Sequence, residues 1–280
     1  PTLCPMISLE QLQSGLVIPI DKPRQWTSFQ VVNKVKSVVR NTYGIKKIKI
    51  GHAGTLDPLA TGLLLVCIGK ATKSIPLLQD CDKVYTGTMI LGATTPCFDL
   101  ERPVDNFYPY KHITRTLVEK TSRKFIGILQ QTPPMFSAVK IDGQRAYEYA
   151  RTDRPSITIQ PKSIEIYNFE ITAFREGVTN QESQTCQKKT AIPIKNLYQN
   201  PLGEIPQHLP QIDFRIHCGK GTYIRSLARD LGEALGSGAF LSDLRRERIG
   251  NYTIDKAILL DNLVMTICDS PDADYMSRHD

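Results

Sequence analysis

The segment at residues 51–62 constrains this chain more than any other part of the sequence. It reads GHAGTLDPLATG and holds three glycines, one proline and a single acidic residue, Asp57. The six residues that follow, LLLVCI, are all apolar, which predicts a short strand buried on both faces. The glycine- and proline-rich segment before them predicts a loop. Because the residue before a proline is restricted to extended or turn conformations, we expect Asp57 to be held rigidly beside a core strand.

Three roles are open for Asp57 on this pattern alone. An aspartate before proline in a glycine-rich loop most often forms a turn. A loop that binds phosphate is a second possibility, but the spacing does not fit, since six residues separate Gly62 from Gly69 where a phosphate-binding loop has four. The third role is a carboxylate aimed at a substrate, which the expected rigidity would suit.

The composition favours a protein that meets a polyanion. The chain has 280 residues, 41% of them hydrophobic, which is enough to build one large domain with or without a small appendage. The net charge is +7 and the pI is about 9.0. A basic balance of this size fits nucleic acid better than an acidic small substrate.

The cysteines and histidines predict no metal site. None of the seven cysteines lies at metal-ligand spacing from another, and the five histidines are scattered. Reduced thiols in a cytoplasmic protein are the expected interpretation. No stretch of about 18 apolar residues is present and no signal peptide is visible, so we expect no membrane association.

Periodicity predicts most of the secondary structure. A helix is expected to begin after Thr27, which forms a capping box with Gln30, and to end at Gly44. Helices are also expected at residues 223–235, capped by Thr222, and at residues 253–268. Alternation predicts strands at residues 83–92, 163–174 and 213–218, the second with a register break. Residues 176–212 are polar and predict a long surface loop or insertion.

Residues 51–62 resemble, nearly residue for residue, the signature loop of the TruB family of tRNA pseudouridine synthases. Further resemblances lie at residues 22–28, 131–138, 221–227 and 238–246, and together they cover roughly residues 16–175 and 213–260. Gln25 stands where the family usually has glycine. The short C-terminus is similar to that of bacterial members that lack the C-terminal PUA domain.

The resemblance implies a catalytic set. Asp57 occupies the position of the family's nucleophile, and Arg225 that of the arginine that pairs with it. An arginine stays charged at any working pH and can hold a carboxylate with two hydrogen bonds. Tyr85 matches the active-site tyrosine, which stacks on the target base and could also act as a base on a transferred proton. Without the resemblance, Tyr85 would be interpreted as a half-buried strand residue and Arg225 as a surface residue.

The resemblance also implies contacts with the substrate. His52, Tyr85, Tyr223 and Leu244 match positions that surround the target nucleotide. Lys22 matches a lysine that is either structural or faces the RNA, although an ordinary surface lysine is the alternative from the residue alone. A uridine inside a stacked helix is out of reach, so these side chains would receive a nucleotide that has been flipped out.

The implied function is isomerisation of uridine to pseudouridine in tRNA, at uridine 55 of the T arm. No cofactor, metal or obligatory protein partner is expected, and a monomer is expected. Two alternatives are a chaperone that binds and folds tRNA, and a guide-dependent enzyme acting on ribosomal RNA.

The expected fold class is α+β, the pseudouridine synthase fold, with a central mixed and mostly antiparallel sheet flanked by helices. We expect one catalytic domain over residues 1–268, with the insertion at residues 176–212, a tail at residues 269–280 and no PUA domain.

Overall fold

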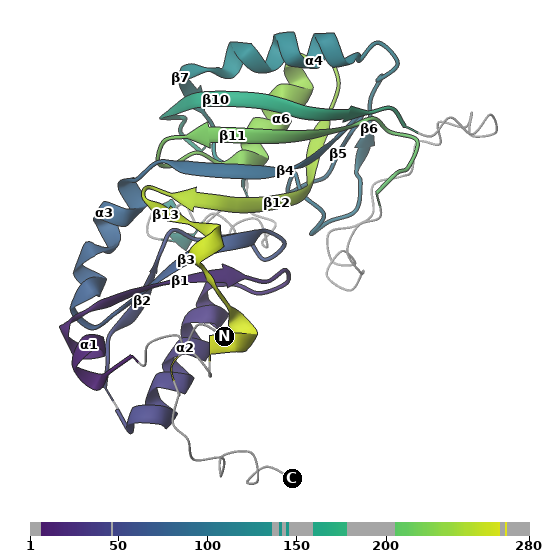
Figure 1. Cartoon of the computed structure of the whole chain (residues 1–280). Helices are drawn as coiled ribbons and strands as arrows, with labels where there is room; N and C mark the ends of the chain where they lie inside the picture. The colour runs from purple at the N-terminus through teal and green to yellow at the C-terminus, as the bar shows by residue number, and fades with distance from the viewer. Residues whose placement is uncertain are drawn as a thin grey trace, which may run out of the picture. The chain divides into compact units, whose positions relative to one another are not determined.

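The computed structural model describes residues 7–45, 47–135, 140–141, 144–145, 159–177, 205–263 and 267. The chain forms two compact units, the first made of Pro1–Asp80 and Arg248–Asp280 and the second of Cys81–Glu247 (Figure 1). The predicted tail and most of the predicted insertion lie outside the described residues. The single domain over residues 1–268 stays a prediction.

Unit 1 contains helices and a small sheet built around the predicted core strand. The described elements are α1 (Leu9–Ser14), β1 (Leu16–Lys22), α2 (Ser28–Tyr43), β2 (Ile50–Ala53), β3 (Thr61–Ile68), α3 (Ile75–Asp80), β13 (Tyr252–Thr253) and β14 (Ile258–Leu259), with 3-10 turns at Gly69–Ser74, Ile254–Lys256 and Leu260–Asn262. The sheet order is β14–β1–β3, and β2 also pairs with β3. The β1–β3 and β2–β3 pairs are antiparallel, whereas β1 and β14 are parallel.

Two sequence predictions for unit 1 are confirmed. Strand β3 is buried along residues 62–68, so both of its faces are covered. Helix α2 begins with the predicted capping box of Thr27 and Gln30 and ends at Gly44, which has a left-handed φ of 65°. The valines of α2 pack on alternate residues of β1 and β3, which gives this unit its hydrophobic core.

Two other predictions for unit 1 are wrong. The predicted loop at residues 51–62 is shorter than expected, because residues 51–53 belong to β2 and pair with β3. The helix predicted at residues 253–268 is wrong over residues 253–262, which form β14 and two 3-10 turns, whereas Leu263 and Ile267 are helical as predicted. Pairing of β14 with β1 satisfies backbone groups that a helix would have satisfied internally.

The described residues of unit 2 form a larger sheet and two helices. The described elements are β4 (Lys83–Leu91), β5 (Ala93–Thr94), β6 (Asn106–Phe107), α4 (Arg115–Ser122) followed by a 3-10 turn at Arg123–Phe125, β7 (Gly127–Gln131), β8 (Lys140–Ile141), β9 (Gln144–Arg145), β10 (Lys162–Arg175), β11 (Gln211–Cys218), α6 (Ile224–Ala234) and β12 (Ala239–Ile249). The sheet order is β12–β4–β11–β10–β7. The β4–β11, β10–β11 and β7–β10 pairs are antiparallel.

The core of unit 2 lies between this sheet and its helices. Figure 1 shows α6 behind the sheet and α4 running beside β10. The rings of Phe125, Phe169 and Phe214 meet edge to face and join the end of α4 to β10 and β11. The predicted register break is confirmed, since β10 slips against β11 near residues 167 and 172. The α+β class with a mixed, mostly antiparallel sheet is thus confirmed.

Candidate active site

The predicted site residues divide between the two units. Lys22, His52 and Asp57 belong to unit 1. The other four, Tyr85, Tyr223, Arg225 and Leu244, belong to unit 2.

The loop that carries Asp57 is anchored on both sides of this residue. The Ser28 hydroxyl, at the start of α2, accepts a hydrogen bond from the Leu56 N–H at 2.9 Å and donates to the Leu56 carbonyl at 3.2 Å. After Asp57, the Ala60 N–H donates to the Asp57 carbonyl at 3.1 Å. Leu56 and Ala60 are buried, while Asp57 is only half-buried. The backbone therefore fixes a carboxylate-bearing residue that is not enclosed by the core.

Lys22 binds the backbone of this loop at Pro58. Its side chain is fully buried, and its ammonium donates to the carbonyls of Trp26 at 2.6 Å, Pro23 at 3.0 Å and Pro58 at 3.3 Å. This position does not fit the predicted contact with RNA, because carbonyl groups of its own unit surround the ammonium. We infer that Lys22 ties the end of β1 to the residue that follows Asp57.

His52, Tyr85 and Leu244 are strand residues. His52 lies on β2 opposite Val66 and is half-buried. Tyr85 lies on β4 opposite Ile216 of β11 and is 8% exposed, and Leu244 lies on β12 and is also buried. Their contacts with a nucleotide stay predictions.

Tyr223 occupies the N-cap position of α6, where Thr222 was predicted to be. The Thr222 hydroxyl instead donates to the Gly219 carbonyl at 3.0 Å. Tyr223 is held by Gln131 at the end of β7, whose amide oxygen accepts from the Tyr223 N–H at 2.8 Å and whose amide nitrogen donates to the Tyr223 carbonyl at 3.1 Å. The next residue, Thr132, accepts from the Ser226 hydroxyl through its carbonyl at 2.8 Å. The sequence did not single out Gln131 as a site residue, although it opens a segment that resembles the family.

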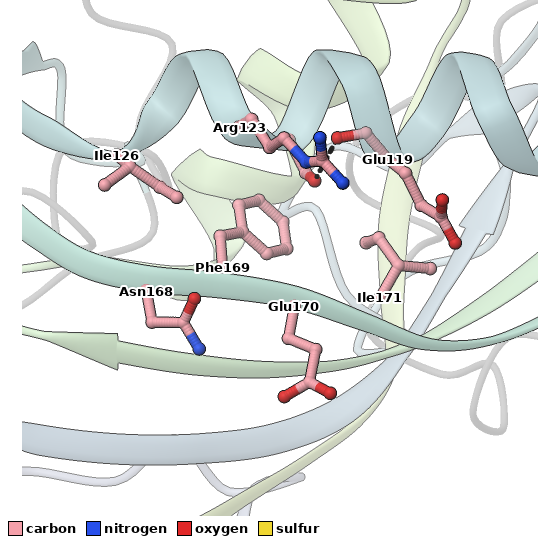
Figure 2. Close-up of a pocket in the computed structure, with 8 residues that line it drawn as sticks. Glu119, Arg123, Ile126, Asn168, Phe169, Glu170 and Ile171 are labelled. Carbon is pink, nitrogen blue, oxygen red and sulfur yellow. Dashed lines mark hydrogen bonds between the residues drawn. The ribbon is translucent and has the colours of Figure 1, made fainter.

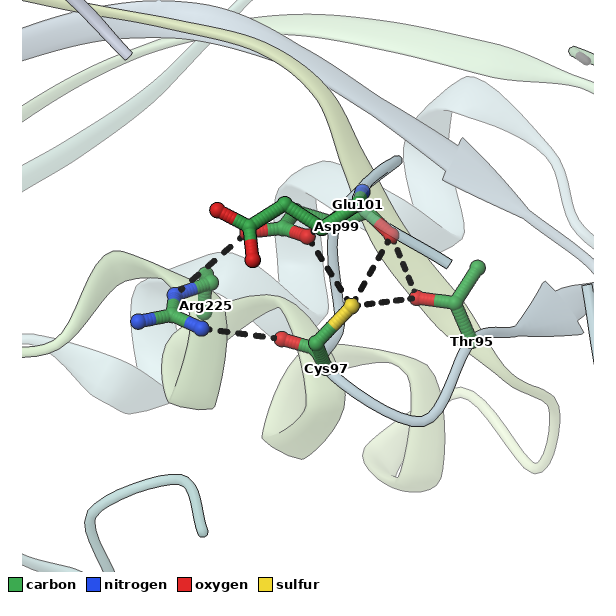
Figure 3. A network of polar contacts seen from close by, with 5 residues as sticks. All are labelled: Thr95, Cys97, Asp99, Glu101 and Arg225. Atoms are coloured by element: carbon green, nitrogen blue, oxygen red, sulfur yellow. Dashed lines mark hydrogen bonds and ion pairs between the residues drawn. The ribbon is translucent and has the colours of Figure 1, made fainter. Parts of the chain in front are cut away.

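Arg225 forms a buried ion pair that the sequence analysis missed. Its Nε lies 3.7 Å from Oδ2 of Asp99, and the two side chains are 5% and 7% exposed (Figure 3). Asp99 follows β5 in the chain and also accepts, at Oδ1, from the Glu101 N–H at 2.9 Å. Arg225 donates from Nη1 to the Cys97 carbonyl at 3.4 Å. Buried ions are tolerated only when they are paired and hydrogen-bonded. The 3.7 Å contact between Arg225 Nε and Asp99 Oδ2 is an ion pair and not a hydrogen bond, and the hydrogen bonds come from the Cys97 carbonyl and the Glu101 N–H.

Comparison with protein families matches two parts of the chain. Residues 40–192 match the N-terminal domain of TruB family pseudouridylate synthases. Residues 225–279 match the C-terminal domain of tRNA pseudouridylate synthase B. This chain belongs to the TruB family. It is therefore a pseudouridine synthase, an isomerase, with the predicted pseudouridine synthase fold.

TruB relatives match most of this chain. The tRNA pseudouridine synthase B of Flavobacterium johnsoniae is 47% identical over 250 residues, which cover 89% of this chain and 94% of the relative. The protein of the same name from Phocaeicola vulgatus is 43% identical over 89% of this chain and 92% of the relative.

Solved structures agree with the TruB assignment. A chain in a crystal structure of a Cbf5-Nop10-Gar1 complex is 28% identical, with a TM-score of 0.59 over 91% of the present chain. A second, in an H/ACA RNP bound to a substrate RNA containing 2'-deoxyuridine, is 25% identical with a TM-score of 0.57. The present chain spans about half the length of these chains, 54% and 55%.

A surface cavity lies in unit 2, between α4 and β10 (Figure 2). It has a volume of about 450 Å³. Its lining residues are Glu119, Ser122, Arg123, Ile126, Asn168, Phe169, Glu170 and Ile171, and none of them is a predicted site residue of this TruB chain.

No group of three or more histidine, cysteine, aspartate or glutamate side chains among the described residues could hold a metal ion. Among the described helices, none is long and apolar enough to cross a membrane.

Proposed function

We propose that this chain converts uridine to pseudouridine in tRNA, at uridine 55 of the T arm, with Asp57 as the nucleophile. Relatives at 43–47% identity are named tRNA pseudouridine synthase B, which supports tRNA as the substrate. The observation that carries the proposal is the loop around Asp57, which matches the family's signature and holds this half-buried residue on an anchored backbone.

The reaction exchanges one bond of the uracil ring for another. The bond between the ribose carbon and the ring nitrogen breaks, the ring rotates, and a ring carbon bonds to the same ribose carbon. That ring carbon then gives up its proton to a base, so no electrons are gained or lost and no co-reactant is consumed. The proposal is the same whether Asp57 attacks the ring or the ribose carbon.

Arg225 supplies the charge that this chemistry needs. A nucleophilic carboxylate must be ionised, and a guanidinium that never loses its proton favours the ionised form. One side of Arg225 is fixed by Asp99 and the Cys97 carbonyl. In the proposed mechanism, Arg225 also pairs with Asp57, as the family resemblance implies.

The remaining predicted residues receive the flipped uridine. Extruding a nucleotide costs a few kcal/mol, and stacking on an aromatic side chain returns about 1–3 kcal/mol. We propose that Tyr85 stacks on the base and that Tyr223, Leu244 and His52 complete the enclosure. Tyr85 is also the proposed base for the proton that leaves the ring carbon.

The test uses the purified chain alone and an unmodified tRNA transcript, followed by mapping of pseudouridine along the RNA. We expect pseudouridine at position 55 and none in a transcript with cytidine at that position. Pseudouridine at other positions only would overturn the proposed target, and absence of any pseudouridine from the transcript with uridine at position 55 would overturn the proposed function.

The same experiment separates the alternatives. A guide-dependent enzyme would form product only when a guide RNA and partner proteins are added. A chaperone would bind and refold the transcript without forming any pseudouridine. We expect neither behaviour, and we expect the active species to elute as a monomer in size-exclusion chromatography.

A further inference from the structure

Residues 95–99 form a tight turn at the end of β5. The Phe98 N–H donates to the Thr95 carbonyl at 3.1 Å, and Phe98 has a left-handed φ of 60°. Few residues other than glycine adopt this conformation, so it needs support from its surroundings. The support comes from the Leu241 N–H, which donates to the Phe98 carbonyl at 3.0 Å, and from Arg229, which lies 5.6 Å from the centre of the Phe98 ring.

This turn directs the carbonyl and the thiol of Cys97 at the Arg225–Asp99 pair. The Cys97 carbonyl accepts from Arg225 Nη1 at 3.4 Å, and the Cys97 thiol lies 3.0 Å from Oδ1 of Asp99 (Figure 3). The two oxygens of Asp99 are thereby used differently. Oδ1 accepts from the Cys97 thiol and the Glu101 N–H, and Oδ2 is the atom that faces the guanidinium.

The Cys97 thiol is protonated and can therefore donate a hydrogen bond. It is 1% exposed, and burial, followed by the negative charge of Asp99, raises the pKa of the thiol well above its ordinary value. It therefore keeps its proton and can hydrogen-bond to the carboxylate. Thr95 fixes the same turn from the other side, since its hydroxyl donates to the Asp99 carbonyl at 2.6 Å.

Cys67 provides the internal comparison. It is also fully buried, and burial raises the pKa of its thiol too. It lies within β3, opposite Val17 of β1 and Gly51 of β2, and burial is the cause of the raised pKa of its thiol. A cysteine that merely fills space would behave like Cys67.

We propose that Cys97 is a positioning residue for pseudouridine formation, whose S–H orients the Asp99 carboxylate and, through it, the Arg225 guanidinium. This inference rests on the proposed function, since it gives Arg225 its purpose beside Asp57. The thiol would act on the rate of the chemical step and leave the binding of tRNA unchanged.

The test compares Cys97→Ala, Cys97→Ser and the matched control Cys67→Ala. The readouts are the single-turnover rate of pseudouridine formation at saturating enzyme, the affinity for tRNA and the thermal unfolding curve. Loss of a hydrogen bond to a charged group predicts that Cys97→Ala slows the rate by about tenfold, with tRNA affinity within about twofold. Cys97→Ser keeps a donor and restores the rate to within about threefold of wild type.

A second comparison tests the route through Asp99. In an Asp99→Ala background, Cys97→Ala should change the rate by less than about twofold, because the oxygen that accepts from the thiol is already gone. A repeat of the full tenfold loss in that background would overturn the route. The inference also fails if Cys97→Ala slows the rate no more than Cys67→Ala, or if Cys97→Ser is as slow as Cys97→Ala.

These outcomes are distinct from failure of the proposed function. If wild type forms no pseudouridine, or if Asp57→Asn remains active, the proposed function is wrong whatever Cys97 does. If Asp57→Asn is inactive and Cys97→Ala matches its control, the role of Cys97 alone is wrong.

Discussion

Gln131 binds the backbone of Tyr223 at both of its polar groups, with hydrogen bonds of 2.8 Å and 3.1 Å. The two residues are 92 positions apart in the sequence. Gln131 is 3% exposed, so no solvent competes for its amide. The end of β7 is therefore bound to the N-cap residue of the helix that carries Arg225.

We predict that Gln131→Ala lowers the free energy of unfolding by about 1–3 kcal/mol, because it leaves the Tyr223 N–H and carbonyl without their buried partner. The rate of pseudouridine formation should fall as well, since the start of α6 loses its anchor. Urea unfolding and single-turnover kinetics measure the two effects. Gln130→Ala is the matched control, because Gln130 is the preceding residue on β7 and is exposed. Equal effects of the two variants would contradict the assignment.

Lys22→Met should destabilise the protein without weakening the binding of tRNA. Methionine keeps most of the buried volume but leaves three carbonyls without the ammonium that donates to them. We expect a loss of about 2–4 kcal/mol in the free energy of unfolding. Lys34→Met, on the exposed face of α2, should change it by less than about 0.5 kcal/mol. Unchanged stability together with weaker tRNA binding would return Lys22 to the RNA contact that the resemblance allowed.

Asp213 predicts a pH-dependent contribution to stability. Its carboxylate accepts from both terminal nitrogens of Arg175 and from the Thr88 hydroxyl, and the hydrogen bond from Arg175 is the main reason that the pKa of Asp213 is lowered. A carboxyl whose pKa is lower in the folded state adds stability above its unfolded pKa of about 4 and loses it as the pH falls through the folded value.

Asp213→Asn should therefore lower the free energy of unfolding at pH 7, by less than about 1 kcal/mol because the pair is partly exposed. The difference from wild type should shrink as the pH falls from 5 to 3. Urea unfolding of both proteins across this range measures it. A difference that stays constant down to pH 3 would show that the carboxylate charge does not contribute.

Local patterns in the sequence were sufficient for elements that depend on nearby residues. The capping box of Thr27 and Gln30, the left-handed Gly44 and the wholly apolar β3 are all encoded within a few positions. The register break in β10 was also visible, because the alternation of apolar residues fails there.

The sequence failed where a distant partner decides the structure. Residues 51–53 look like a loop by composition, but in the structure they pair with residues 65–67 of β3. Residues 253–268 have apolar residues at helical spacing, yet two of them, Ile258 and Leu259, form β14 and pair with β1. In both cases, strand pairing overrode the local preference.

The candidate site shows the same limit. The resemblance supplied Asp57 and Arg225 because both lie in motifs that can be read along the chain. It gave no role to Asp99, whose carboxylate the structure places 3.7 Å from Arg225, or to Ser28, which binds Leu56 across 28 positions.

The central claim is that Asp57 is the nucleophile, and its most direct test is the single-turnover rate of Asp57→Asn on unmodified tRNA. Asparagine keeps the size of the side chain but cannot attack, so we expect the rate to fall by more than about a thousandfold. The affinity for tRNA should stay within about threefold of wild type, and Asp261→Asn, an exposed carboxylate of the same unit, should remain fully active. Pseudouridine formation by Asp57→Asn at a rate near that of wild type would contradict the account.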